Sequence, residues 1–209
     1  MLMGNQSEQS VAAVVLAAGR SRRMGQPKMI LPWGDTTVIG RVVGVLHQAA
    51  IQRVVVVTGG ARRQVEAALS GSAVKLVFNP RFAQEEMLVS LQLGLRALEN
   101  DAAAALVVLG DQPQIKVEVV QLILDRYRAR QAPLVVPSFQ MRRGHPWLVE
   151  RRLWKSILEL RSDCTMRDFL NQYADQIDYL MVDTSSVLQD LDTPKDYQRQ
   201  RPPDSKPGC

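Results

Sequence analysis

Small and basic residues follow directly after the first apolar run of the chain, in residues 16–28. Ala17, Ala18 and Gly19 would let a ligand approach the main chain closely, and successive exposed amides bind anions. Arg23 and Lys28 add positive charge. This charge would offset the negative charge of a triphosphate and stabilise the negative charge that builds on a leaving pyrophosphate. The segment predicts a phosphate-binding loop, and the alternative is a basic surface loop whose glycine only serves a turn. It contains neither a Gly-Lys-Ser/Thr P-loop nor a G-x-G-x-x-G motif.

Carboxylates that could bind a metal ion occur in two later segments. The apolar run 104–109 leads into Asp111, and ligand sites in α/β sheets lie at the carboxyl ends of such strands. Carboxylate oxygens are ligands that suit Mg²⁺. The alternative for Asp111 is a turn or helix-capping residue. Residues 190–197 contain Asp190 and Asp192 before a Thr-Pro pair, which equally fits an ordinary helix start with a capping Asp or Thr.

Short apolar runs alternate with amphipathic stretches along the chain, a pattern typical of layered α/β domains. The Val-rich run 11–17 is typical of a strand buried on both faces of a parallel sheet. We therefore predict a three-layer, Rossmann-like α/β fold, with a mostly parallel sheet and helices on both faces. Strands are expected at residues 11–17, 53–58, 74–78, 104–109, 134–137 and 179–182, and helices at residues 37–49, 62–70, 88–100, 117–130, 150–160 and 165–173.

Length and composition predict one domain. With 209 residues, 46% of them hydrophobic, we expect a domain over residues 11–198 between disordered residues 1–10 and 199–209. The net charge of +5 could indicate nucleic acid, but the excess lies largely in the predicted phosphate loop and the tail, so we expect no nucleic-acid partner. Cys164 and Cys209 form no disulfide framework, which favours the cytoplasm, and no apolar run approaches the roughly 20 residues of a membrane span.

Residues 16–28 resemble the L-A-[AG]-G-x-S-x-R-M-G-x-x-K signature of the MobA-like nucleotidyltransferases. The Leu-Ala-Ala-Gly string is similar to the molybdenum cofactor cytidylyltransferase branch. Leu-Gly-Asp-Gln-Pro at 109–113 and residues 190–197 resemble the metal-binding strand end and closing motif of that family. The resemblance implies a nucleotide-diphospho-sugar transferase-like fold and Mg²⁺ bound by Asp111 and Asp192. It also implies nucleotide contacts by Leu16, Ala17, Ala18, Gly19, Arg23 and Lys28, with Arg23, Lys28 and Asp111 catalytic.

Further segments resemble the base and acceptor motifs of this branch. Residues 87–95 are similar to G-M-x-x-S-L-Q-x-G-L with Glu86 in place of the usual Gly, which implies that Ser90 lies near the base; the alternative is a helix-capping serine. Thr58, after the second strand, is expected to border the nucleotide. Arg-Gly-His-Pro at 143–146 and the partial match at 162–170, where Thr165 and Met166 replace Gly and Ala, imply acceptor contacts by Arg143, His145, Asp163 and Arg167. A hydrogen-bonded turn histidine is the alternative for His145.

The implied reaction transfers CMP from CTP to the terminal phosphate of a molybdopterin-type molybdenum cofactor and releases pyrophosphate. The implied protein partners are xanthine dehydrogenase-type apoenzymes or their loading chaperones. Two alternatives stay open from the sequence: transfer to another phosphorylated acceptor such as a sugar phosphate, and a non-catalytic nucleotide-binding regulatory module.

Overall fold

The computed structural model describes residues 10–84, 87–98 and 102–203. Within these ranges, none of the helices is both long and apolar enough to cross a membrane. The strands are β1 (Val11–Ala17), β2 (Pro32–Trp33), β3 (Thr36–Thr37), β4 (Val54–Thr58), β5 (Lys75–Phe78), β6 (Ala104–Leu109), β7 (Leu134–Phe139), β8 (Arg142–Arg143), β9 (Trp147–Glu150) and β10 (Ile177–Met181). The α-helices are α1 (Val38–Gln48), α2 (Arg62–Ala68), α3 (Met87–Ala97), α4 (Val117–Arg130), α5 (Trp154–Glu159), α6 (Met166–Gln172) and α7 (Pro194–Gln200).

In the described part of the chain, one mixed sheet has the strand order β10-β7-β9-β6-β1-β4-β5, and β8 pairs with the end of β7. β1 lies at the centre and runs parallel to β4 on one side and β6 on the other. β9 is antiparallel to both of its neighbours, β6 and β7. The carboxyl ends of β1, β4 and β6 therefore meet at one edge of the sheet, where α/β folds bind ligands.

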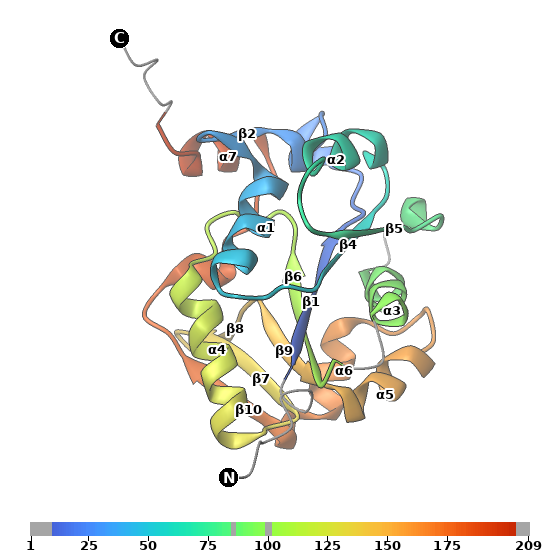
Figure 1. The fold of residues 1–209 in the computed structure, drawn as a ribbon, viewed down its shortest axis with the longest axis vertical. Helices are drawn as coiled ribbons and strands as arrows, with labels where there is room; N and C mark the ends of the chain where they lie inside the picture. The colour runs from blue at the N-terminus through green and yellow to red at the C-terminus, as the bar shows by residue number, and fades with distance from the viewer. Residues whose placement is uncertain (1–9, 85–86, 99–101, 204–209) are drawn as a thin grey trace.

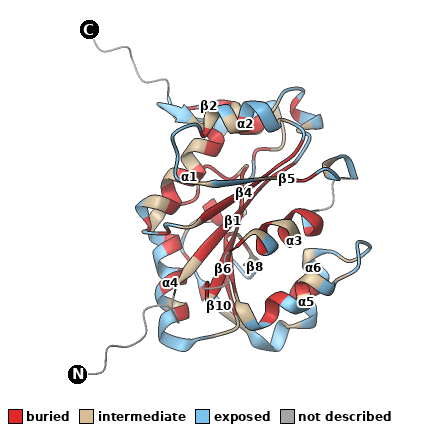
Figure 2. Cartoon of the chain, turned by 45° about the vertical axis from the view of Figure 1, so that its right-hand side comes forward, coloured by how far each residue is buried: buried red, intermediate tan, exposed pale blue. Residues whose placement is uncertain are grey.

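Helices cover both faces of the sheet, as Figure 1 shows. The alternating residues of β1 divide between two cores: Ala13 and Val15 pack with α1, α2 and α4, whereas Val14 packs with α3, α5 and α6. These three residues are fully buried, and the central strands are largely red in Figure 2. This two-sided burial explains the continuous apolar runs in the sequence, and the predicted three-layer, mostly parallel α/β fold is confirmed.

α3 approaches the sheet very closely at Gly94. A Cβ atom at this position would lie 2.2 Å from Cγ1 of Val14 in β1, closer than any real contact. Glycine at position 94 therefore lets the helix lie directly on the central strand. This contact fixes the distance between α3 and β1.

A third, smaller core joins α7 to the β2–β3 hairpin. Trp33 and Tyr197 pack their rings 6.4 Å apart, and the Tyr197 hydroxyl donates a hydrogen bond of 2.6 Å to the carbonyl of Pro32. Leu191, just before α7, is fully buried in the same core. This core anchors the closing segment of the chain beside the phosphate loop.

The structure corrects three of the expected boundaries. Ser10 is tied to the sheet, because its carbonyl accepts a 2.8 Å hydrogen bond from the N–H of Ala103. Helix α7 continues to Gln200, since Tyr197 anchors it, so residues 199 and 200 are helical rather than disordered. The expected helix 150–160 is wrong at its start, because Glu150 belongs to β9 and α5 begins only at Trp154. Residues 1–9 and 204–209, also predicted to be disordered, lie outside the described residues.

Candidate active site

The predicted phosphate loop follows β1 as a compact, internally bonded segment. Ser21 and Gly25 adopt positive φ angles of 54° and 72°, which reverse the chain on either side of the short 3-10 helix η2 (Arg22–Met24). The Ser21 hydroxyl accepts a 3.1 Å hydrogen bond from the N–H of Lys28, which closes the loop. Met24 is buried in the third core. The buried Met24 side chain therefore attaches the loop to this apolar core.

Neighbouring strand ends contact this loop through glycines. A Cβ atom at Gly59, after β4, would lie only 2.3 Å from the carbonyl oxygen of Ala18. The N–H of Gly110, after β6, donates a 3.0 Å hydrogen bond to the carbonyl of Leu16. Close approach of the main chain at these positions brings the ends of β1, β4 and β6 into one surface.

The acidic residues come from two segments that are joined by the main chain. The N–H of Leu191 donates a 3.1 Å hydrogen bond to the carbonyl of Asp111, which follows β6. Leu191 is buried, while Asp190 and Asp192 on either side of it face the same cavity as Asp111. Burial, with added repulsion from Asp192 and Asp111, raises the pKa of Asp190. Three carboxylates therefore share this edge of the sheet.

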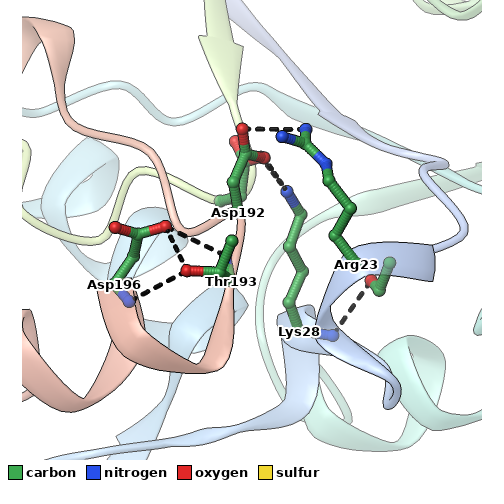
Figure 3. Close-up of polar contacts among 7 residues, drawn as sticks. Arg23, Lys28, Asp192, Thr193 and Asp196 are labelled. Carbon is green, nitrogen blue, oxygen red and sulfur yellow. Dashed lines mark hydrogen bonds and ion pairs between the residues drawn. The ribbon is translucent and has the colours of Figure 1, made fainter.

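Figure 3 shows Arg23 and Lys28 converging on Asp192 in a network of ion pairs. Lys28 Nζ contacts Asp111 Oδ2 and lies 3.3 Å from Asp192 Oδ1. Arg23 Nη2 lies 2.8 Å from Asp192 Oδ2. The Lys28 side chain is only 10% exposed, whereas that of Arg23 is 70% exposed. Lys28 is therefore a fixed charge inside the site, and Arg23 a charge at its rim.

The position of Lys28 provides a test of whether the site suits a divalent cation. Its ammonium group lies between Asp111 and Asp192, so both carboxylates already face one point where a positive charge is stabilised. Among the described residues, no group of three or more Asp, Glu, His or Cys side chains is arranged to hold a metal ion. Two carboxylates with water and substrate phosphates as the other ligands is the arrangement that Mg²⁺ commonly uses. The donor set therefore fits, and the metal role of both residues stays a prediction.

A cavity of about 370 Å³ extends from this network over the phosphate loop. Its volume falls in the range of small-molecule sites. Among the nucleotide-binding residues predicted from the sequence, it is lined by Leu16, Ala18, Gly19, Arg23, Lys28 and Ser90. It is also lined by Arg20, Ser21, Arg22, Met29, Asn79, Phe82, Met87, Leu109, Asp111, Asp190 and Asp192.

Ser90 is the fourth residue of α3 and not its cap, so the capping alternative is wrong. It is 4% exposed, and its hydroxyl accepts a 3.0 Å hydrogen bond from Nδ2 of Asn79. Asn79 and Phe82 also line the cavity, and neither was among the site residues predicted from the sequence. Glu86, which replaces a family glycine before this helix, lies outside the described residues.

Two predicted nucleotide-binding residues are not part of the lining. Thr58 is fully buried, and its hydroxyl is directed to the carbonyl of Val77 in β5, 3.4 Å away. Ala17 is 1% exposed, the last residue of β1. Within the described residues, both support the sheet beneath the cavity, and a direct role in nucleotide binding stays a prediction.

The four predicted acceptor residues lie outside the lining of the described cavity. Arg143 in β8 donates hydrogen bonds to the Tyr179 hydroxyl (2.9 Å) and to Oδ1 of Asn171 (2.7 Å). Asp163 is exposed and paired locally with Arg161 at 3.1 Å. Arg167 is exposed on α6.

His145 lies beneath the segment that leads to the acidic residues. The main-chain N–H of His145 donates a 2.8 Å hydrogen bond to the carbonyl of Val187, in the 3-10 helix η7 (Ser185–Leu188). Burial lowers the pKa of His145 to about 4, so the imidazole is neutral at physiological pH. This main-chain hydrogen bond agrees with the alternative of a hydrogen-bonded turn histidine. The role of His145 toward an acceptor stays a prediction.

Comparison with known proteins adds an independent observation. The family model described as "MobA-like NTP transferase domain" matches residues 13–177. The molybdenum cofactor cytidylyltransferase of Escherichia coli (strain K12) is 26% identical over 192 residues, which cover 90% of this chain and 94% of that protein. The crystal structure of Rv0371c from Mycobacterium tuberculosis H37Rv is similar with a TM-score of 0.81 and 31% identity, covering 92% of this chain and 97% of that chain. A structure of Rv0371C in complex with manganese has a TM-score of 0.74 and 28% identity, covering 91% and 97%.

Proposed function

The chain belongs to the family of MobA-like NTP transferase domains and is a nucleotidyltransferase, and from this premise we propose that it transfers CMP from CTP to the terminal phosphate of a molybdopterin-type molybdenum cofactor. The observation that carries the proposal is the network in which Lys28 joins Asp111 and Asp192 at the floor of a cavity lined by the phosphate loop. The name of the relative from Escherichia coli supports the choice of CTP and acceptor.

The proposed reaction is a single displacement at phosphorus. An oxygen of the acceptor's terminal phosphate forms a bond to the α-phosphorus of CTP, the bond from that phosphorus to the β-phosphate's bridging oxygen breaks, and pyrophosphate leaves with that electron pair. No covalent intermediate with the protein is needed. Since both reactants are polyanions, the protein contributes mainly by aligning them and offsetting their charge.

Lys28 and Arg23 supply that charge in different ways. The main-chain N–H of Lys28 is held by Ser21 and its ammonium by the carboxylates, so this charge is in place before substrate binds. A charge already held at the site stabilises the negative charge that builds in the transition state. Arg23, at the exposed rim, can follow the phosphates as they move.

We propose that Asp111 and Asp192 hold a Mg²⁺ ion, which when bound neutralises phosphate oxygens and favours attack on phosphorus. The facing carboxylates and the manganese complex of a related structure support this assignment. A binding experiment tests it without turnover: Mn²⁺ affinity, followed by electron paramagnetic resonance, should fall in Asp192→Asn. Unchanged Mn²⁺ affinity would contradict the assignment.

CTP as the donor is supported by Leu16, Ala18 and Gly19 at one wall of the cavity and Ser90 at another. Pyrophosphate release should be measured with each nucleoside triphosphate, Mg²⁺ and a panel of phosphorylated acceptors. The proposal expects the fastest release with CTP and the molybdopterin-type acceptor. Equal or faster turnover with GTP would exclude the CTP preference.

Arg143, His145, Asp163 and Arg167 are proposed to serve the acceptor. Arg143→Ala should raise the KM for the acceptor and leave CTP affinity unchanged, because Arg143 does not line the cavity. Arg128→Ala, which removes an exposed arginine on α4, is the matched control. A large loss of CTP affinity in Arg143→Ala would exclude the assignment.

In the proposed function, xanthine dehydrogenase-type apoenzymes or their chaperones receive the product.

Another phosphorylated acceptor, such as a sugar phosphate, is the second candidate. The observation that favours it is the start of α6, where the Thr165 hydroxyl accepts a 3.2 Å hydrogen bond from the N–H of Asp168. This loop is a regular helix cap where the cytidylyltransferase branch has small residues. Turnover of sugar phosphates in the acceptor panel, with none of the molybdopterin-type acceptor, would decide for this candidate.

A further inference from the structure

Asn79 is a polar residue that lines the cavity and is almost completely buried. It is 1% exposed and directly follows β5. Its N–H donates a 2.9 Å hydrogen bond to the carbonyl of Thr58, and its carbonyl accepts one of 3.3 Å from the N–H of Phe82. Its side-chain oxygen Oδ1 accepts a 2.8 Å hydrogen bond from the N–H of Arg81. These three bonds hold both the main chain and the amide group in one orientation.

The bond to Arg81 decides which way the amide faces. Because Oδ1 is paired with a main-chain donor, the amide nitrogen Nδ2 must be the atom that lies 3.0 Å from Oγ of Ser90. An amide nitrogen can only donate, so the Ser90 hydroxyl accepts this bond. The single hydrogen of that hydroxyl is therefore available to a different acceptor.

Ser90 faces the cavity from a wall on which the described lining residues carry no charge. The charged lining residues belong to the phosphate loop and to the acidic segments, whereas the stretch from β5 into α3 contributes Asn79, Phe82, Met87 and Ser90. An apolar wall with a few placed polar groups is typical of a site for a flat heterocycle. In such a place, a hydroxyl that already accepts one hydrogen bond and whose hydrogen is turned away from that donor favours ligand atoms that accept.

We propose that Asn79 is a positioning residue for base recognition: it occupies the Ser90 hydroxyl as an acceptor and so directs its hydrogen toward an acceptor atom on the edge of the nucleotide base, such as a ring carbonyl oxygen. This inference rests on the proposed function, because it takes the cavity to be the nucleotide site. Asn79 itself acts through Ser90.

A double-mutant cycle tests the inference, with CTP binding measured by calorimetry. Asn79→Asp keeps the bond to the Arg81 N–H but replaces the Nδ2 donor by an acceptor, which reverses the bond to Ser90. We expect Asn79→Asp and Ser90→Ala each to weaken CTP binding roughly tenfold, the value of one good hydrogen bond. In the Ser90→Ala background, Asn79→Asp should then cost far less than in the wild type.

Steady-state kinetics give a second readout that a purely structural role would not produce. A contact with the base is present in the ground state and the transition state alike, so both variants should raise the KM for CTP with little change in kcat. Gln84→Ala is the matched control, because Gln84 accepts a bond from Arg81 Nε in the same turn but does not line the described cavity. Its CTP affinity should equal that of the wild type.

The outcomes separate the two proposals. If the wild type binds no nucleoside triphosphate, both the proposed function and this inference are overturned. If it binds CTP, and Ser90→Ala leaves the affinity unchanged or the two substitutions have additive effects, the inference alone is overturned. A thermal unfolding scan of each variant shows whether it is folded, and Asn79→Asp keeps the turn bond so that a folded variant is expected.

Discussion

The ammonium of Lys28 lies 3.3 Å from the carboxylate of Asp192, although 164 residues separate the two in the sequence. Lys28 lies in the phosphate loop and Asp192 in the closing segment before α7. Asp111, after β6, contacts the same ammonium. The two ends of the chain are therefore joined at the point where we propose that phosphoryl chemistry occurs.

Replacing Lys28 by a side chain of similar length without charge should abolish most of the activity. Lys28→Met is expected to lower kcat by about 10²–10³-fold, because a preorganised donor at the developing negative charge is lost. The control is Lys155→Met, since the Lys155 side chain is 82% exposed on α5. Pyrophosphate release in single-turnover mode measures the effect. Near-normal kcat in Lys28→Met would exclude Lys28 from catalysis.

Asp111→Asn keeps the size of the side chain and removes its charge. We expect the Mg²⁺ concentration for half-maximal turnover to rise and kcat to fall roughly hundredfold, while thermal unfolding changes little. Asp125→Asn, at an exposed carboxylate on α4, controls for the general loss of negative charge. If Asp111→Asn turned over normally at low Mg²⁺, Asp111 would be only a structural residue after β6.

The lowered pKa of His145 should make the protein sensitive to mild acid. Its pKa is lowered from 6.5 to about 4 in the folded state, so between these values the unfolded chain binds more protons. The free energy of unfolding should therefore fall as pH decreases from about 6.5 to about 4, by roughly 3 kcal/mol at most. His145→Gln lacks this contribution. Urea unfolding at about pH 7 and about pH 5 should show a smaller difference for the variant, and an equal difference would contradict the prediction.

Two helical glycines should respond in opposite directions to alanine. Gly94→Ala places a methyl group 2.2 Å from Val14 and should destabilise the protein by about 1–3 kcal/mol. Gly44→Ala in α1 meets no atom within 4 Å and should stabilise it by about 0.5–1 kcal/mol. Chemical denaturation of the pair measures both. Equal effects at the two positions would show that α3 does not rest on β1 as closely as described.

The cap of α7 should be measurable separately from the ion network beside it. Thr193 and Asp196 form a capping box, and the bond from the Thr193 hydroxyl is the main cause that lowers the pKa of Asp196. Thr193→Ala should lower stability by about 1 kcal/mol at neutral pH, and Thr193→Ser should restore it. Because the folded pKa of Asp196 is depressed, the contribution is present above its ordinary pKa and is lost as pH falls through the folded value. A wild-type thermal midpoint in Thr193→Ala at neutral pH would show that the cap contributes nothing.

Local patterns were enough to predict the strand 11–17, the turn of small residues after it, and the position of Asp111 just after the strand 104–109. Each depends on neighbours in the sequence: an apolar run determines a buried strand, and small residues after it permit a turn. The predicted bounds of the helix 117–130 agree with those of α4 at both ends, because apolar residues at helical spacing are also a local pattern. The antiparallel strand β9 was not predicted, because its pairing with β7 and β6 depends on residues between 13 and 46 positions away, which no local period reveals.

Resemblance to a family placed Asp192 and Ser90 in the site, but only the tertiary structure shows what holds them there. The Asp111 carbonyl accepts from Leu191, and Asn79 donates to Ser90, and both bonds join segments that reach each other through the folded sheet. The tertiary structure also decides that Thr58 faces β5 and that Arg143 is bonded to Tyr179. The direction of a side chain depends on long-range packing, whereas the position of a strand or turn depends mainly on the residues within it.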